Sequence, residues 1–303
     1  MVEVRPFARR DREQLARLVN AHVAAVLPGG YVPPATLLAD LEHPLGEFII
    51  GPWVTDMATL VAIEADRVVA AAHLRRYGDD DRVSTGYRNA GEIVWLVAWP
   101  NHPEAGRAVR DGAIGHLVSW GVRVHFASGT LPCPAVYGVS DGWPHVRTLY
   151  QEAGFEPADG QVEVVLAGVT SDITAAGAPP VAGLSLHRHV GTLGTTFRGV
   201  LDGEVVGMFE VDTDLTRGGT NLGAAGWADE CNHRVREDMR GQGIGTWLVR
   251  SAGEWLRLGG TTRLLAYAIE DDHLEARIRY YARFGLRPVN RTSRGWTREP
   301  QRN

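Results

Sequence analysis

One order of structural elements is predicted twice along this chain of 303 residues. In each half the spacing of apolar residues predicts a strand, a hairpin, a strand, a long helix, a strand, a helix and a final strand. The long helices are expected over 104–120 and 243–259, and the strands before them over 92–99 and 226–235. Because strands that alternate with helices fold as helices packed on sheets, this internal repeat predicts two domains of mixed α/β architecture.

A stretch without hydrophobic periodicity separates the two halves. Residues 170–183 are rich in Ala, Gly and Pro, a composition typical of a linker. We therefore predict a first domain over residues 1–170, a linker over 171–182 and a second domain over 183–303. The length of the chain is comfortable for two domains.

The composition is that of a globular protein without a dominant charge of one sign. Apolar residues make up 44% of the chain and charged residues 22%, and the net charge of -5 offers no overall attraction to nucleic acid or to an anionic membrane. No run approaches the roughly 20 apolar residues of a membrane span, and the first residues lack the apolar core of a signal peptide. The sequence therefore predicts no nucleic acid partner and no membrane partner.

Cysteine usage favours a reducing compartment. Cys133 and Cys231 lie far apart and are the only cysteines in the sequence, so a disulfide framework has no support. Neither CxxC nor HExxH spacing occurs, so no metal site is predicted. From these features we expect a cytoplasmic protein.

A glycine-rich turn at 240–245 follows a predicted strand and opens the second long helix. Glycine lets the backbone turn tightly and approach a ligand, and the first amides of a helix have no intrahelical acceptor. With the positive end of the helix dipole they form an anion site suited to a pyrophosphate, which Arg236, Arg240 and Arg250 would strengthen. The alternative is a turn that merely connects strand and helix. A Walker loop is excluded because no Gly-Lys-Ser/Thr follows.

This turn resembles the acetyl-CoA signature of the GNAT superfamily of N-acetyltransferases, Arg/Gln-x-x-Gly-x-Gly/Ala. Arg240, Gly243 and Gly245 fill its fixed slots, and the resemblance extends over residues 183–298. It implies a GNAT-like α/β (α+β) fold, with a mixed, mostly antiparallel central sheet flanked by helices, and acetyl-CoA (coenzyme A) as cofactor. The cofactor-binding residues that it implies are Val235, Arg236, Arg240, Gly241, Gln242, Gly243, Ile244, Gly245 and Thr246.

The resemblance also assigns catalytic parts. Val235 stands where the strand of the family splays from its neighbour, so the main chain around Val235 and Arg236 would meet the acetyl carbonyl. The motif that runs from Tyr281 to Gly285 and Leu286 resembles the closing helix of the family, whose tyrosine gives a proton to the leaving thiolate. Tyr280 is adjacent, but the spacing to Gly285 selects Tyr281. A core aromatic with a satisfied hydroxyl is the alternative role.

Attack by an amine requires its neutral form, so a general base or a water chain is expected. In the family this base is often a Glu six residues before the Val slot, and the count falls on Asp229, with Glu230 adjacent. Because Asp is one methylene shorter than Glu, a water relay is favoured, and a solvated strand residue is the alternative. His233 is another candidate base, since its ordinary pKa lies near physiological pH. Nothing in the sequence marks Cys231 as an activated acyl carrier.

The first half resembles the same family more faintly. Pro103 replaces the leading Arg or Gln of the cofactor loop, which removes a backbone donor and a side chain from the phosphate cradle. We therefore expect this degenerate domain to bind coenzyme A weakly or not at all. The whole chain resembles a tandem GNAT protein, an arrangement shared with mycothiol synthase. The matching residues of the first half are Glu92, Ile93, Leu96, Ala98, Pro100, Gly106, Ala108, Tyr150, Gly154 and Phe155.

The resemblance implies an acetyl-CoA-dependent N-acetyltransferase that transfers the acetyl group directly to a primary amine of a small molecule. Two alternatives stay open: a non-catalytic acyl-CoA-binding or sensor protein, and transfer in the first domain through Glu92 and Tyr150.

The second half is expected to lack the first two helices, since it has only residues 191–196 where the first half has helices within 11–42. In the family these helices usually line the acceptor pocket. We hypothesise that the first domain, the linker or a partner chain completes the acceptor groove, with 29–53 as a candidate wall. The partner chain could be a second copy in a homodimer, although the sequence gives no specific support for one.

Overall fold

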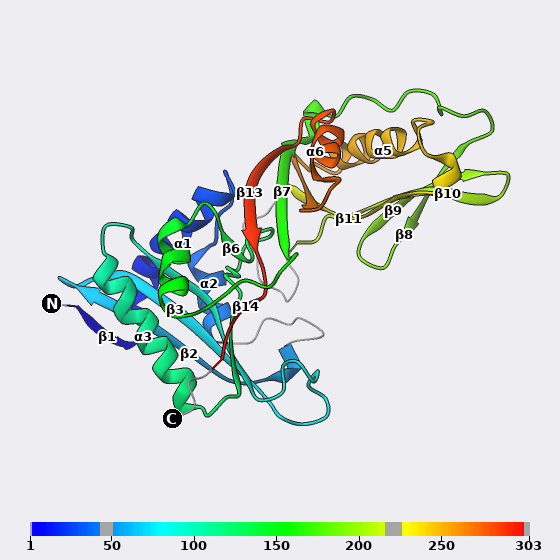
Figure 1. Ribbon diagram of the computed structural model, residues 1–303. Helices are drawn as coiled ribbons and strands as arrows, with labels where there is room; N and C mark the ends of the chain where they lie inside the picture. The colour runs from blue at the N-terminus through cyan, green and yellow to red at the C-terminus, as the bar shows by residue number, and fades with distance from the viewer. Residues whose placement is uncertain (1, 43–50, 216–225, 300–303) are drawn as a thin grey trace. The chain divides into compact units, whose positions relative to one another are not determined.

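The computed structural model describes residues 2–42, 51–215 and 226–299, which form two compact units (Figure 1). The first unit begins at the N-terminus and ends at Glu163, and the second runs from Val164 to Val289. The described residues from Asn290 onward return to the first unit. This division differs from the expected boundaries near residues 170 and 183. The last strand predicted for the first half belongs mostly to the second unit, and the C-terminal segment belongs to the first.

The sheet of the first unit is mixed and mostly antiparallel, as the resemblance to the GNAT superfamily implies. Its order is β1-β2-β3-β4-β5-β14, and the pairing of β4 with β5 is its one parallel pairing in the described ranges. Ala65 and Asp66, with φ of 47° and 61°, form the expected tight turn between β2 and β3. The strands are β1 (Glu3–Pro6), β2 (Val54–Glu64), β3 (Arg67–Tyr77), β4 (Ala90–Ala98), β5 (Val124–Ala127) and β14 (Trp296–Arg298).

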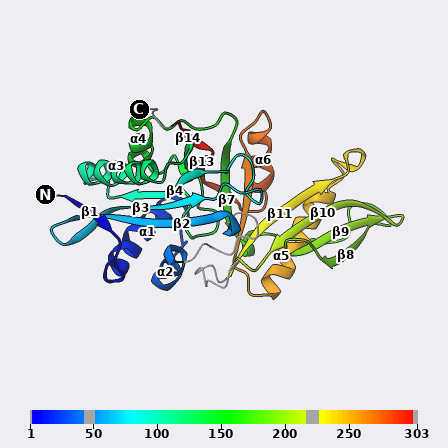
Figure 2. The same cartoon turned by 90° about the horizontal axis from the view of Figure 1, so that it is seen from below.

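Four helices cover this sheet at the places where helical spacing predicts them: α1 (Arg12–Val26), α2 (Pro34–Glu42), α3 (Pro103–Ser119) and α4 (Pro144–Glu152). α2, α3 and α4 begin with proline, which suits the first helical position because its amide would have no partner there. Figure 2 shows α3 on one face of the sheet and α1 and α2 on the other. A further short strand, β6 (Val139–Ser140), pairs with Thr292 and Ser293.

The sheet of the second unit has the order β13-β7-β12-β11-β10-β9-β8. β11 and β12 are parallel, whereas β8, β9, β10 and β11 pair antiparallel in succession. Asp202 and Gly203, both with positive φ, form the turn that the sequence predicts between β9 and β10. The strands are β7 (Val162–Val169), β8 (Ser185–Val190), β9 (Thr195–Leu201), β10 (Glu204–Asp212), β11 (Trp227–Val235), β12 (Arg263–Ile269) and β13 (Arg287–Ser293).

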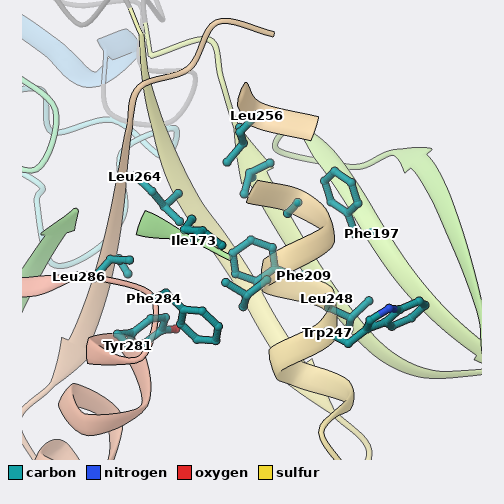
Figure 3. Packing of buried hydrophobic residues seen from close by; sticks show 14 of the residues in the cluster. Ile173, Phe197, Phe209, Trp247, Leu248, Leu256, Leu264, Tyr281, Phe284 and Leu286 are labelled. Atoms are coloured by element: carbon teal, nitrogen blue, oxygen red, sulfur yellow. The ribbon is translucent and has the colours of Figure 1, made fainter. Parts of the chain in front are cut away.

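The core of the second unit lies between this sheet and two helices, α5 (Ile244–Leu258) and α6 (Leu274–Ala282). Figure 3 shows Leu248 and Leu256 of α5 facing Phe209, with Phe284 closing the cluster near α6. Only four residues, 191–194, separate β8 from β9, so no helix stands between them. None of the helices in the described ranges has the length and apolar content that crossing a membrane requires.

The segment 170–183, expected to be a linker, is held on the second unit at its beginning. Thr170 N donates to Thr262 O over 2.9 Å, and Ile173 is buried in the core. Arg257 Nη1 donates to the carbonyl oxygens of Thr170 and Ile173, each over 2.8 Å. One apolar side chain and main-chain groups make these contacts, so a search for hydrophobic periodicity does not detect them.

Candidate functional site

The site of the second unit begins where two parallel strands part. Within the described residues β11 pairs with β12 only through Trp227–Asp229, and the rest of β11 pairs with β10 alone. Val211 lies opposite Glu230 and Glu210 lies opposite Asn232, so Cys231 is an extra residue that makes a β-bulge. Because a bulge changes which side chains share a face, a count of residues along an ideal strand fails here.

The bulge places Glu230, and not Asp229, on the wall of a cavity of about 940 Å³. Asp229 lies opposite Asp212 in the ladder and is absent from the wall. The cavity is within the size range of small-molecule and cofactor sites. Its wall comprises Glu230, His233, Arg234, Val235, Met239, Arg240, Gly241, Gly243, Ile244, Gly245, Thr246, Tyr267, His273, Ala276, Arg277, Tyr280, Tyr281 and Arg283.

A hydrogen bond on the cavity wall joins two predicted catalytic residues. Tyr281 Oη donates a hydrogen bond to Glu230 Oε1 over 2.5 Å. Burial raises the pKa of Glu230 to about 8, with the Asp229 charge acting in the same direction and the Tyr281 hydrogen bond opposing it. Burial, followed by the Glu230 charge, also raises the pKa of Tyr281. Glu230 Oε2 is buried and makes no hydrogen bond in the described part of the chain.

A neutral histidine and a second tyrosine stand beside this pair. Burial lowers the pKa of His233 to about 4, so its imidazole is uncharged near pH 7. Tyr280 Oη lies 3.4 Å from His233 Nε2, and His233 Nδ1 lies 3.8 Å from Glu230 Oε1. Tyr280 and Tyr281 both line the cavity, with ring centroids 5.3 Å apart. Both tyrosines therefore line the cavity, although the spacing to Gly285 selects Tyr281 alone for the thiolate.

Cys231 does not have the environment of a nucleophile. Burial and the neighbouring acidic charges raise the pKa of its thiol to about 12. A thiolate is the reactive form, so this bulge residue stays inert near neutral pH. No group of three or more His, Cys, Asp or Glu side chains among the described residues is arranged to hold a metal ion.

The glycine turn has the backbone geometry of an anion site. Gly241 and Gly243 have φ of 77° and 83°, in the left-handed region that favours glycine. Gly243 is the N-cap of α5 without a side-chain cap, and the first helical hydrogen bond runs from Trp247 N to Gly243 O. The amides at the start of α5 therefore have no intrahelical acceptor. A Cβ on Gly245 would lie 3.1 Å from both His233 Nε2 and Tyr280 Oη, so glycine permits the close packing of α5 against them.

All but two of the predicted cofactor residues line the cavity. Arg236 Nη1 pairs with Glu204 Oε2 over 2.6 Å, and its Nε pairs with Asp238 Oδ1 over 2.7 Å. The exposed Gln242 lies against Met239, with Nε2 3.8 Å from Sδ. The side chains of Arg236 and Gln242 therefore contribute nothing to the wall.

The main chain distinguishes Val235 from Arg236. Arg236 N donates to Val206 O over 2.9 Å, so that amide is already used in the sheet. Hydrogen-bonded and non-hydrogen-bonded pairs alternate along an antiparallel ladder, which makes Gly207 and Val235 a non-hydrogen-bonded pair. The Val235 N–H therefore points away from β10, toward the side from which β12 has diverged.

Several wall residues were missed by the reasoning from sequence. One group lies on α6 and at its two ends, at positions 273, 276, 277 and 283, which together with Tyr280 recur at the three- and four-residue spacing of one helix face. That spacing was a usable signal once Tyr281 had been placed on the site. The missed residues are Arg234, Met239, Tyr267, His273, Ala276, Arg277 and Arg283.

The first unit repeats the strand geometry but blocks the corresponding donor. β4 is parallel to β5 over Ala90–Ile93, and the register shift of β4 against β3 leaves Val94 as the extra residue. Trp99 N donates to Val69 O, as Arg236 does to Val206, which makes Ala98 the counterpart of Val235. The Ala98 amide, however, donates to His22 Nε2 over 3.4 Å. Burial lowers the pKa of His22 to about 4, so its ring is neutral and able to accept.

The other parts of this first site also differ from the second. A Cβ on Gly106 would lie 2.9 Å from Leu149 Cδ1, so α4 covers the start of α3. The Tyr150 hydroxyl is buried, and in the described ranges it makes no hydrogen bond. Glu92 accepts a hydrogen bond from Tyr77 and not from Tyr150. Residues 43–50, part of the candidate acceptor wall at 29–53, lie outside the described residues.

Comparison with known proteins agrees with this geometry. Residues 182–286 match the model of the acetyltransferase (GNAT) family. No curated protein sequence matches the chain.

Among solved structures, a tandem GNAT protein from the clavulanic acid biosynthesis pathway, determined without AcCoA, is 19% identical, with each chain covered completely and a TM-score of 0.61. A GCN5-related N-acetyltransferase from Sphaerobacter thermophilus is 14% identical over 98% of this chain and 95% of that one, also with a TM-score of 0.61. A glucosamine N-acetyltransferase region of a fungal multi-domain β-N-acetylglucosaminidase is 14% identical over 98% of this chain and 38% of that one, with a TM-score of 0.60. Residues 182–286 thus match the acetyltransferase (GNAT) family, and the whole chain shares its fold with tandem GNAT proteins.

Proposed function

We propose that the second unit transfers an acetyl group from acetyl-CoA directly to the primary amine of a small molecule. The observation that carries this proposal is that a single cavity contains both the open start of α5 and the Glu230–Tyr281 pair. An anion site and a proton-transferring pair in one cavity are what a nucleotide-linked thioester and an amine require.

The residues present fit the diphosphate of coenzyme A. The left-handed Gly241 and Gly243 turn the chain so that the first amides of α5 are available to an anion. Arg240, Arg277 and Arg283 lie on the same wall and add positive charge. Arg277 Nη2 also pairs with Asp271 Oδ1 over 2.5 Å, which fixes its position. Bound there, acetyl-CoA would supply an activated thioester carbonyl.

Glu230 is the candidate general base. Its pKa of about 8 places the carboxylate in the range where a base functions near neutral pH, and it can accept, directly or through one water, the proton that the substrate ammonium loses before the neutral amine attacks. Asp229 then acts indirectly, because its charge helps to raise the pKa of Glu230. Because His233 is neutral, its ring adds no positive charge that would repel the incoming ammonium substrate.

Val235 N–H is the candidate donor to the oxygen that becomes negative during attack, since it points into the gap between the diverging strands. Tyr281 is the candidate acid for the departing thiolate. Its raised pKa keeps the hydroxyl protonated and available as a donor. Direct transfer forms the amide bond, breaks the thioester bond and releases the thiol without a covalent enzyme intermediate. This accords with a protonated thiol at Cys231.

A thiol-release assay with acetyl-CoA and a panel of primary amines tests the proposal. Tyr281→Phe should lower the rate by about 10²-fold or more, the scale of a lost proton donor. Tyr150→Phe is the matched control, because the Tyr150 hydroxyl is buried without a hydrogen bond in the described residues. A loss of rate in Tyr150→Phe alone would move the reaction to the first unit. Binding of acetyl-CoA without thiol release over the panel would identify a non-catalytic binding protein.

A further inference from the structure

A second cavity, of about 400 Å³, lies in the first unit and has no part in the proposed reaction. β3 and β4 contribute Arg75, Tyr77 and Glu92 to its wall. Tyr87, from the segment between these strands, and Phe126 of β5 line it as well. The volume is sufficient for a small organic molecule.

The uncompensated charge of this cavity is negative. Arg75 lies opposite Glu92 in the ladder, but its Nη2 is 3.3 Å from Asp40 Oδ1. Arg294 at the wall has Glu163 Oε2 3.6 Å from its Nη1. Glu92 is 8% exposed and accepts a hydrogen bond from the neutral Tyr77 hydroxyl, and in the described part of the chain no basic side chain forms an ion pair with it. Each arginine of the wall thus has an acidic partner, whereas among the described residues the buried carboxylate has no cationic one.

The walls around Glu92 suit an organic cation. Tyr87 packs edge-on to Tyr77, with ring centroids 5.1 Å apart. The ring centroids of Tyr87 and Phe126 are 5.3 Å apart. Aromatic faces attract ammonium groups, most strongly where water is excluded. A buried carboxylate is costly unless it is paired, so a cation bound beside Glu92 would gain both interactions.

A molecule bound in this cavity would not be acylated there, because the first unit lacks donors that an acyl-CoA needs. The amide of Ala98, the counterpart of Val235, is occupied by His22 Nε2. Pro103 at the first position of α3 has no amide proton, and Leu149 packs against Gly106. Two of the donors that would hold an acyl-CoA in the first unit, the amides at positions 98 and 103, are therefore used or missing.

We propose that the first unit binds a small organic ammonium ion in this cavity, with Glu92 as its counter-ion and Tyr77, Tyr87 and Phe126 as its aromatic walls. The site recognises an amine without acylating it. The proposal goes beyond the acetyl transfer proposed for the second unit and does not depend on it, since all of its residues belong to the first unit.

Calorimetric titration of the full chain tests this site. The probes are phenethylammonium chloride and 2-phenylethanol, which have similar shape and differ in charge. All titrations use a chain that carries Glu230→Gln, so that the cavity of the second unit loses its Glu230 carboxylate. We expect the ammonium to bind about tenfold or more tightly than the alcohol. Adding Glu92→Gln, which retains an acceptor for the Tyr77 hydroxyl, should lower ammonium affinity about tenfold or more and leave alcohol affinity within about twofold.

Arg294→Gln is the matched control, since its exposed side chain carries the opposite charge on the same wall. Removing this positive charge should leave ammonium affinity unchanged or increase it, whereas a site for an anion would lose affinity. Circular dichroism and a thermal melt establish that each variant is folded, and Tyr87→Leu provides an independent loss of affinity if Glu92→Gln does not fold. The proposal is overturned by equal affinity for both probes, by Glu92→Gln without effect, or by no binding at about 10 mM probe.

Discussion

Replacing Glu230 by Gln should make the second unit more stable at alkaline pH. Gln has nearly the same shape and can still accept the Tyr281 hydrogen bond, but it cannot become charged. In the folded protein burial raises the pKa of Glu230 from its ordinary 4.5 to about 8. The folded state therefore holds this proton more tightly than the unfolded state.

The direction and the size of this pH-dependent change in stability follow from the two pKa values of Glu230. Stabilisation by the protonated carboxyl is complete below about pH 4.5 and is lost as the pH rises to about 8. The two pKa values differ by about 3.5, and each pKa unit corresponds to about 1.4 kcal/mol. The loss of stability is therefore about 5 kcal/mol as an upper limit. Between about pH 5 and about pH 9, the free energy of unfolding of Glu230→Gln should therefore rise by several kcal/mol relative to that of the original chain.

Urea unfolding at these two pH values measures the effect. The relevant transition is the one that acetyl-CoA shifts, because a ligand stabilises the unit that binds it. Subtracting the free energy of unfolding of the original chain from that of Glu230→Gln at each pH cancels the contributions of the other titrating groups. Glu104→Gln, on an exposed side chain of α3, is the control and should show no such pH dependence. The reasoning is refuted if Glu230→Gln differs from the original chain by the same free energy at both pH values.

Four further predictions concern the second unit. In the original chain, kcat/KM for an aromatic amine, which is neutral throughout this range, should rise through about pH 8, and Glu230→Gln should lose this step together with about 10²- to 10⁴-fold in rate. Gly245→Ala should weaken acetyl-CoA binding, measured by calorimetry, because the new Cβ would lie 3.1 Å from His233 Nε2 and from Tyr280 Oη; unchanged affinity would contradict the packing argument. Ile173→Ala should lower the free energy of unfolding by about 2–5 kcal/mol, whereas a free linker would show almost no change. Iodoacetamide should modify Cys231 slowly in the native protein and rapidly in urea, since its thiol pKa is about 12 when folded; mass spectrometry that finds rapid native labelling would contradict this environment.

The sequence alone predicted the repeat, the fold class and nearly all helices and strands, because these depend on local spacing of apolar residues and on turn residues such as Asp202 and Gly203. The exchange of end segments between the units was not predictable in this way. β7 and β14 pair with strands far away in the sequence, and nothing in their own residues specifies which unit they join. The strand after the first long helix was predicted over 135–139, of which only Val139 lies in a strand, β6, whereas β5 at Val124–Ala127 was not predicted, because it lies next to a stretch rich in Gly and Pro.

At the candidate site, the glycine turn was recognisable because Gly241 and Gly243 adopt conformations that other residues avoid. The choice between Asp229 and Glu230 was not, because a single bulge at Cys231 changes which side chain faces the cavity. A bulge is a property of two paired strands and leaves no reliable mark in one of them. The ion pairs that hold Arg236 away from the wall likewise involve Glu204 on a different strand.

We expect the amides at the start of α5 to bind the diphosphate of coenzyme A. Amide NMR of the full chain, labelled with nitrogen-15 and titrated with coenzyme A, measures this binding residue by residue. The largest shifts should occur at Gly243, Ile244, Gly245 and Thr246, with small changes at the start of α3 in the first unit. Unshifted amides at the glycine turn, with saturable shifts near Glu104 and Ala105 in their place, would contradict it.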